Sequence, residues 1–220
     1  MREKKGFGAA DKLLNKVAFE KRLREAERKA KDVFDDRYLS EADWEFLLLD
    51  ATLLAGVFAA EEFGLTHVGS RLDDELGVTL LRSGEDLEDG VVLGLQTTGS
   101  EPPFEVVGVT EGPKWSGDTD SVVNYVNELL AKPGWAFTAA WTDSEGRRHV
   151  TADYGLTQAH CSVKAETFAE GGKLETPVAV SEHPSLGAAL CFAHSLNKAC
   201  GRLFGGASYS ELEEFTARRK

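Results

Sequence analysis

The chain has 220 residues, of which 42% are hydrophobic and 28% charged, proportions that are ordinary for a globular protein and exclude a disordered chain. Its net charge of −12 disfavours non-specific binding to nucleic acid or to anionic membranes. Three cysteines are too few for a secreted disulfide framework and no apolar signal segment follows the N-terminus, so we expect a cytoplasmic protein.

The charge is unevenly distributed along the chain. Residues 1–38 carry +4, residues 39–120 carry −15 and residues 121–220 carry −1. An acidic middle of this kind aids solubility, and it also suits a polyanion mimic or a surface that receives a basic partner. We expect three domains: a charged arm at residues 1–39, an acidic helix with a small sheet at 40–117, and an α+β sandwich at 118–220.

The arm is predicted to contain an amphipathic helix over residues 12–34. Its apolar positions follow the helical period: Phe19, Leu23, Ala26, Ala30 and Val33. Its other faces are densely charged and include Arg24 and Arg28, so only the apolar stripe is suited to burial, against the body or against a partner helix. Acidic residues interleave with the basic ones, which disfavours a nucleic-acid-binding arm.

A second helix is predicted over residues 41–63, because Ser40 and Asp43 have the spacing of a capping box. It is apolar all round, so it is either the central helix of the chain or packs into an oligomer or partner. The apolar run Phe46–Ala60 is too short for a membrane span and contains Asp50. The two helices supply our candidate interaction residues: Phe19, Leu23, Arg24, Arg28, Phe46, Leu49, Leu53 and Val57.

The rest of the chain is predicted to form sheet and helix in alternation. Residues 64–89 are acidic and read as irregular, with a short helix and strand as the alternative, formed by Leu72, Leu76, Val78, Leu80 and Leu81. Residues 91–96 and 104–110 read as strands. The predicted elements that follow begin with a helix at 118–131, capped by Asp118 or Asp120. Strands at 135–142 and 147–154 are predicted to form a hairpin, with Gly146 at the turn position that needs a positive φ. Strands at 159–166 and 176–181, a helix from 186 to 204 and a short helix at 211–219 complete the prediction. The predicted class is α+β: N-terminal helices and a mostly antiparallel sheet flanked by helices, with an α-β-β-β-α C-terminal unit.

Cysteine and histidine residues gather between His149 and Cys200. A tetrahedral zinc site would draw on a cysteine and histidine set: Cys161, Cys191, His194 and either His160 or Cys200. The same residues suit a nucleophile pair, with Cys161 or Cys191 as thiolate, His194 or His160 as base and Asp153 as the orienting acid. Core packing of the cysteines is the simpler interpretation, because no C-x-x-C pair is present.

Three short motifs lie within residues 116–204: Ser116-Gly-Asp-Thr-Asp120, Gly134-Trp135 and Glu182-His-Pro-Ser-Leu-Gly-Ala-Ala-Leu190. This stretch resembles the phage ABA-sandwich domains found in bacteriophage proteins of unassigned function. The resemblance implies a phage or prophage origin, a location in the host cytoplasm and no catalytic residues. An arginine that those domains often place early in the last helix is absent here.

The sequence carries no recognised catalytic motif. Together with the all-round apolar helix and the split in charge, this predicts a non-enzymatic protein without a cofactor. Its partners would be another protein or a second copy of itself in an oligomer, and neither nucleic acid nor membrane. The alternative is a Cys/His-dependent enzyme or a zinc-binding module that uses Cys161, Cys191 and His194.

Overall fold

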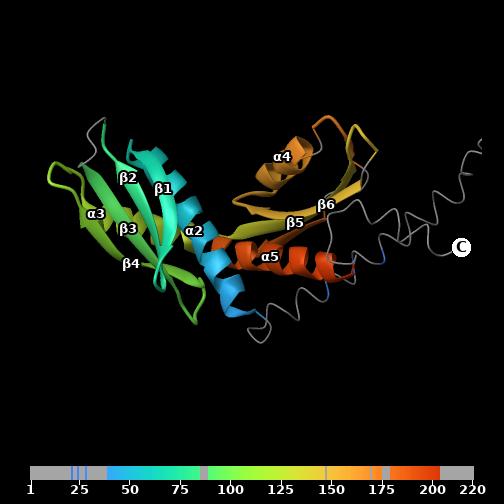
Figure 1. Cartoon of the computed structure of the whole chain (residues 1–220), viewed down its shortest axis with the longest axis horizontal. Helices are drawn as coiled ribbons and strands as arrows, with labels where there is room; N and C mark the ends of the chain where they lie inside the picture. Colours follow the sequence, from blue (N-terminus) through green and yellow to red (C-terminus); the bar gives the residue numbers. More distant parts are fainter. Residues whose placement is uncertain are drawn as a thin grey trace, which may run out of the picture.

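Two separate antiparallel sheets and the helices packed on them form the described part of the chain, shown in a computed structural model in Figure 1. The structure describes residues 39–84, 89–146, 148–168, 170–174 and 179–203, together with Lys21, Arg24 and Arg28. The predicted α+β class is confirmed. The predicted arm helix and the predicted helix at 211–219 lie outside the described residues, except that Lys21, Arg24 and Arg28 are helical and exposed.

Helix α2 (Glu41–Glu62) begins at the predicted capping box. The Asp43 carboxylate accepts a hydrogen bond from the Ser40 backbone N–H over 2.7 Å, and the Ser40 hydroxyl accepts one from the Asp43 N–H. Leu47, Ala51 and Ala55 are fully buried. In Figure 1, α2 crosses the middle of the molecule between the two sheets. It is therefore the central helix of the chain, one of the two alternatives left open by the sequence.

The first sheet is a four-stranded meander in the order β1-β2-β3-β4. Its strands are β1 (Thr66–Asp73), β2 (Leu76–Arg82), β3 (Gly90–Thr97) and β4 (Phe104–Glu111). Strands β3 and β4 confirm the prediction. The prediction of irregular structure at 64–89 is wrong, because β1 and β2 form a hairpin there. Of the alternative short helix and strand, the structure has a strand at Leu76–Arg82, and the segment before it is strand β1 and not a helix. Its tight turn contains Asp74 in the left-handed conformation (φ 53°), which aspartate tolerates better than most residues.

Helix α3 (Thr119–Ala131) is capped by Asp118, one of the two caps that the sequence predicts. Its buried residues Val122 and Val126 share one core with α2 and the first sheet. We call this cluster the main core. The Asn127 side chain on α3 also accepts a hydrogen bond from the Val106 N–H over 3.0 Å, which satisfies a backbone group of the edge strand β4.

The second sheet is built around β5 (Gly134–Thr142), which pairs with β6 (Arg148–Gly155) in the predicted hairpin. Gly146 takes a positive φ of 83° in the connecting turn, as the sequence predicts. Two short strands, β7 (Lys173–Leu174) and β8 (Ala179–His183), pair with the other edge of β5. Residues 175–178, which include the first three residues of the predicted fourth strand, lie outside the described residues.

Helices α4 (Gln158–Phe168) and α5 (Leu186–Leu203) cover opposite faces of the second sheet (Figure 1). The predicted strand at 159–166 is wrong, because this segment is helical. Cys161 and Ala165, one helical turn apart, are fully buried against Phe137 and Ala139 of β5. Val163 is 58% exposed, although a strand would place it on the same face as Cys161 and Ala165. The start of α5 agrees with the prediction, since the hydroxyl of Ser185 accepts a hydrogen bond from the Ala188 N–H over 3.0 Å.

Candidate interaction surfaces on helix α2

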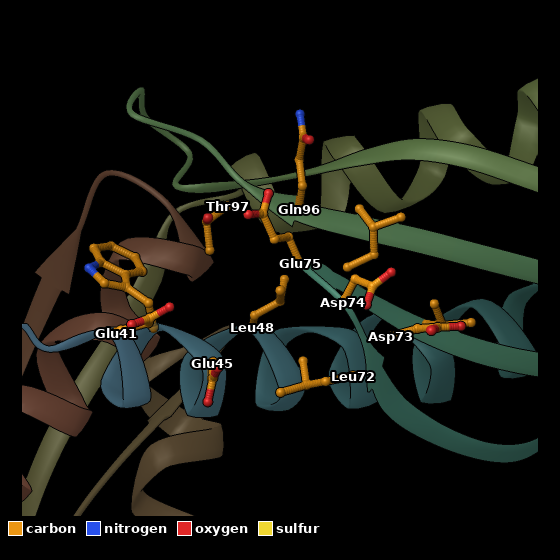
Figure 2. A pocket seen from close by; sticks show the side chains of 12 residues that line it. Glu41, Glu45, Leu48, Leu72, Asp73, Asp74, Glu75, Gln96 and Thr97 are labelled. Atoms are coloured by element: carbon orange, nitrogen blue, oxygen red, sulfur yellow. The ribbon is translucent and has the colours of Figure 1, made fainter.

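A groove of about 780 Å³ opens beside the N-terminal half of α2 (Figure 2). It lies between that helix, the β1–β2 turn and the end of β3. The residues that line it are Glu41, Trp44, Glu45, Leu48, Leu72, Asp73, Asp74, Glu75, Leu76, Val78, Gln96 and Thr97. We call this feature the acidic groove. Its residues come from three separate segments, which the packing of the first sheet on α2 brings together.

Local structure explains how each wall of the acidic groove presents its side chains. Glu41, Trp44, Glu45 and Leu48 have the i, i+3, i+4, i+7 spacing of one helix face, so α2 presents them side by side. On the opposite wall, the tight β1–β2 turn places three consecutive acidic residues, 73–75, at the tip of the hairpin. Figure 2 shows the carboxylates of the helix and of the turn on two sides of the same hollow.

The groove combines an acidic rim with an apolar floor. Five carboxylates line it, and all five side chains are exposed: Glu41, Glu45, Asp73, Asp74 and Glu75. Among the described residues that line it, none is lysine, arginine or histidine. Leu48 in the floor is only 4% exposed, and Trp44 and Leu72 beside it are half-buried. This arrangement suits a cationic ligand that also carries an apolar group.

A second surface on α2 is an apolar row that the described part of the chain leaves open. Phe46, Leu53 and Val57 are 56%, 44% and 46% exposed, and Leu49 between them is half-buried. We call Phe46, Leu49, Leu53 and Val57 the apolar stripe. Their i, i+3, i+7, i+11 spacing places them on one helix face. These are the four α2 residues that the sequence predicts for interaction, and the structure brings them together in one row.

Two polar contacts near the stripe join α2 to the last third of the chain. The Tyr154 hydroxyl on β6 donates to the Asp50 carboxylate over 3.2 Å. Nε2 of His194 on α5 lies 3.1 Å from Oδ1 of Asp43, and its ring stacks on Phe46 with 5.2 Å between ring centres. Burial raises the pKa of Asp50, while its hydrogen bond with Tyr154 lowers it. Burial, followed by the charge of Asp50, raises the pKa of Tyr154.

Asp50→Asn is expected to raise the melting temperature at pH 7. A raised carboxyl pKa means that the folded state holds the proton more tightly than the unfolded state. This proton stabilises the fold fully at pH values below 3.8, the ordinary pKa of aspartate. That stabilisation is lost as the pH rises through the raised pKa of Asp50. Asparagine keeps an oxygen for Tyr154 without a charge, so its advantage should shrink as the pH falls towards 4. Thermal unfolding from pH 4 to 8 measures this.

Glu111→Gln is a suitable control for that experiment, because Glu111 is exposed at the end of β4. Its melting temperature should follow that of the wild type at each pH. An Asp50→Asn protein that melts at or below the wild-type temperature at pH 7 would contradict the expectation.

The two described cysteine side chains of the predicted catalytic or zinc set lie on different faces of the second sheet. Cys161 on α4 is buried beside β5, and burial raises the pKa of its thiol to about 11, so it is not a thiolate at neutral pH. Cys191 on α5 is 1% exposed and belongs to the main core, on the other side of the sheet. Both therefore have the burial of core cysteines.

The remaining members of that set lie at separate places in the fold. His160 is exposed at the start of α4. The Asp153 carboxylate forms an ion pair with Lys164 over 3.2 Å. Cys200 lies in α5. Among the described residues, no three His, Cys, Asp or Glu side chains come together in a group that could hold a metal ion. The Cys/His site stays a prediction from sequence, without support from these contacts.

Comparison with known protein families, curated proteins and solved structures found no match to this chain. Within the described ranges, every helix falls short of the length and apolar character that a membrane span requires.

Sequence reasoning missed two features of α2. The contact of Asp50 with Tyr154 had one signal, since Asp50 is the only charged residue in the apolar run from 46 to 60. The acidic groove had a partial signal, because two glutamates share a helix face with Trp44 and Leu48. The opposite wall could not be predicted once residues 64–89 were read as irregular.

Proposed function

We propose that this protein is a non-enzymatic interaction protein whose acidic groove receives a basic, partly apolar segment of a protein partner. The observation that carries the proposal is the groove itself: five exposed carboxylates surround an apolar floor at Trp44, Leu48 and Leu72. Its volume of about 780 Å³ falls in the range of pockets that hold a drug-sized ligand.

The two parts of the groove have different roles in this proposal. Exposed carboxylates contribute mainly to the rate of association and to specificity, because solvent screens them in the bound state. The apolar floor supplies the burial that retains the ligand, through contacts with Leu48 and Trp44. Binding should therefore weaken as the ionic strength rises, since salt screens the rim and leaves the floor unaffected.

The test uses the full chain and a labelled octapeptide, Lys-Lys-Lys-Leu-Leu-Lys-Lys-Lys, with the corresponding Glu-Leu peptide as a negative control. Fluorescence anisotropy measures binding at about 20 and about 150 mM salt. Salt screens the charges of the rim weakly at the first concentration and strongly at the second. We expect binding of the lysine peptide that weakens with salt, and no binding of the glutamate peptide. We expect E41K/E45K to weaken binding of the lysine peptide about tenfold or more.

The matched control is E61K/E62K, which makes the same change in net charge at the other end of α2. Glu61 and Glu62 are exposed and do not line the groove. This variant should retain binding to within about a factor of two. Equal loss in the two variants would show a general charge effect, and no binding by the wild type would show that the groove does not receive a basic segment. Either result would overturn the proposal.

A further inference from the structure

We propose that the outer edge of β1 binds an extended segment of a protein partner, which adds to the first sheet as a further strand. The contact uses residues 69–73 of β1 and a hollow on the outer face of the sheet, the face turned away from α2. This goes beyond the acidic groove, whose lining does not include Gly69, Ser70 or Arg71.

The first step is a comparison of the edges of the two sheets. Strands β1, β4 and β6 lie at edges and have eight residues each. On β4, the Val106 N–H donates to the side chain of Asn127 over 3.0 Å. On β6, the Ala152 N–H donates to the Asn197 side-chain oxygen over 3.0 Å, and the Asn197 amide donates to the Ala152 carbonyl over 2.9 Å. Helix side chains therefore occupy backbone groups at both of these edges, which opposes the addition of a strand there.

The second step is that the edge of β1 lacks such a cover in the described part of the chain. There, the backbone groups of residues 70–73 hydrogen-bond only to β2. The pairing with β2 is regular from Gly69 to Asp73, because its one bulge lies between His67 and Gly69. Alternate residues of a paired strand direct their N–H and C=O groups away from the neighbouring strand. An open edge of this kind is the surface that strand addition requires.

The third step is an apolar hollow of about 330 Å³ beside this edge. Its apolar side chains are Val68, Val78, Leu80 and Val92, of which Val68 and Val92 are 49% and 38% exposed. Gly69 lies opposite Leu80 on the same face, and no atom lies within 4 Å of a Cβ built at Gly69. A side chain of the added strand opposite Gly69 therefore has room to cross the glycine and cover the hollow. A large apolar side chain suits this position, because it buries the valines and the leucine.

The fourth step is charge. Arg71 and Asp73 follow Gly69 at intervals of two residues on the same face, and their side chains are 75% and 57% exposed. Opposite charges at facing positions stabilise a pair of strands. The added strand therefore gains from an acidic residue opposite Arg71 and from a basic residue opposite Asp73. Read from its N-terminus, an antiparallel segment has a basic, an acidic and a large apolar residue at alternate positions.

The fifth step decides between a partner protein and a second copy of this chain. Antiparallel pairing of residues 69–73 with the same residues of another copy is centred on Arg71, so the two arginines lie opposite each other. Like charges at facing positions destabilise a strand pair. A shift of register that separates the arginines leaves fewer paired residues. The segment of a partner protein is therefore the better occupant.

Binding of a labelled peptide, Lys-Val-Glu-Val-Phe, to the full chain tests the inference. In an antiparallel strand, its Lys, Glu and Phe lie opposite Asp73, Arg71 and Gly69. We expect fluorescence anisotropy to show binding that weakens about tenfold or more when alanine replaces the phenylalanine, because a buried ring is lost.

Two N-methylated forms of the peptide separate strand addition from contact through side chains alone. One form is methylated at its first, third and fifth residues, and the other at its second and fourth. Only one of these sets points its N–H groups towards β1. We expect one form to bind about tenfold or more weakly and the other to retain binding to within about threefold. Equal binding of the two forms would overturn the inference.

Charge reversal tests the register. Arg71→Glu should weaken binding by about threefold or more, and a peptide with lysine in place of its glutamate should restore it. Lys132→Glu is the matched control, because it makes the same change in charge at an exposed residue after α3 and should leave binding unchanged. Equal loss in the two variants would overturn the inference, as would no binding by the wild type.

The second copy and the acidic groove are tested in the same assay. A dimer of the free chain that the peptide dissociates, as measured by sedimentation, would show a second copy at this edge and would overturn the inference. E41K/E45K should retain binding of this peptide to within about a factor of two, because solvent screens exposed charges away from the contact. Failure of one proposal therefore leaves the other standing.

Discussion

Phe104→Ala is expected to lower the free energy of unfolding by about 3–5 kcal/mol, the range for removal of a fully buried phenylalanine. Phe104 is 0% exposed at the start of β4. Its ring makes an edge contact with Trp44 of α2, with 6.4 Å between ring centres. On its other side, a Cβ built on Gly187 of α5 would lie only 3.2 Å from the ring. The side chain therefore joins the first sheet, the central helix and the last helix.

Urea denaturation followed by tryptophan fluorescence and by circular dichroism measures this loss. Val107→Ala in the same strand is the control, because Val107 is 44% exposed and its truncation should change stability by no more than about 0.5 kcal/mol. Since Phe104 contacts three elements, we expect the two probes to report one coincident transition in the variant. A loss of stability below about 1 kcal/mol would show that the packing of the first sheet, α2 and α5 does not depend on this ring.

Gly134→Ala is expected to destabilise the fold by about 1–3 kcal/mol, the cost of overpacking a tight contact. A Cβ at this position would lie 2.7 Å from Cα of Leu186, 2.7 Å from Cβ of Ala189 and 2.9 Å from the carbonyl oxygen of Ser185. Two of these three atoms belong to the backbone of the start of α5, so a rotamer change cannot relieve the clash. The helix has to move away from β5.

Gly108→Ala is the matched control, since it adds the same methyl group to another strand glycine. No atom lies within 4 Å of a Cβ built at Gly108. Its melting temperature should stay close to that of the wild type, while Gly134→Ala should melt several degrees lower. Equal melting temperatures for the two variants would contradict the close approach of α5 to β5.

The elements that sequence reasoning predicted correctly are those specified by local signals. The capping box at Ser40 and Asp43 fixed the start of α2, and Asp118 fixed that of α3. The β5–β6 hairpin combines strict alternation with a glycine at the turn position that needs a positive φ. In each case, residues within one turn or one hairpin determine the local structure.

The errors occur where distant contacts decide the structure. Cys161, Val163 and Ala165 alternate with polar residues, which suggested a strand. Val163 is 58% exposed, however, while Cys161 and Ala165 pack on β5, and this pairing requires the helical period. The β1–β2 hairpin was missed because its strands carry charged residues and its turn is Asp74-Glu75 rather than a pair that contains glycine.

The two candidate surfaces on α2 also differ in whether the sequence alone could predict them. The apolar stripe could be predicted, because all four of its residues lie on one helix and their spacing is visible in the sequence. The acidic groove could not, since residues 41–48, 72–78 and 96–97 meet only after the first sheet has packed on α2. A site assembled from three segments requires the tertiary fold.

The main core has a consequence for the order of folding during synthesis. Leu47 on α2 and Leu190 on α5 belong to the same core, although about 140 residues separate them. At roughly 5–20 residues per second, a ribosome takes on the order of 7–30 s to make that stretch. Throughout this interval the nascent chain exposes the side of α2 and the first sheet that α5 finally covers, so translation must reach α5 before the main core closes.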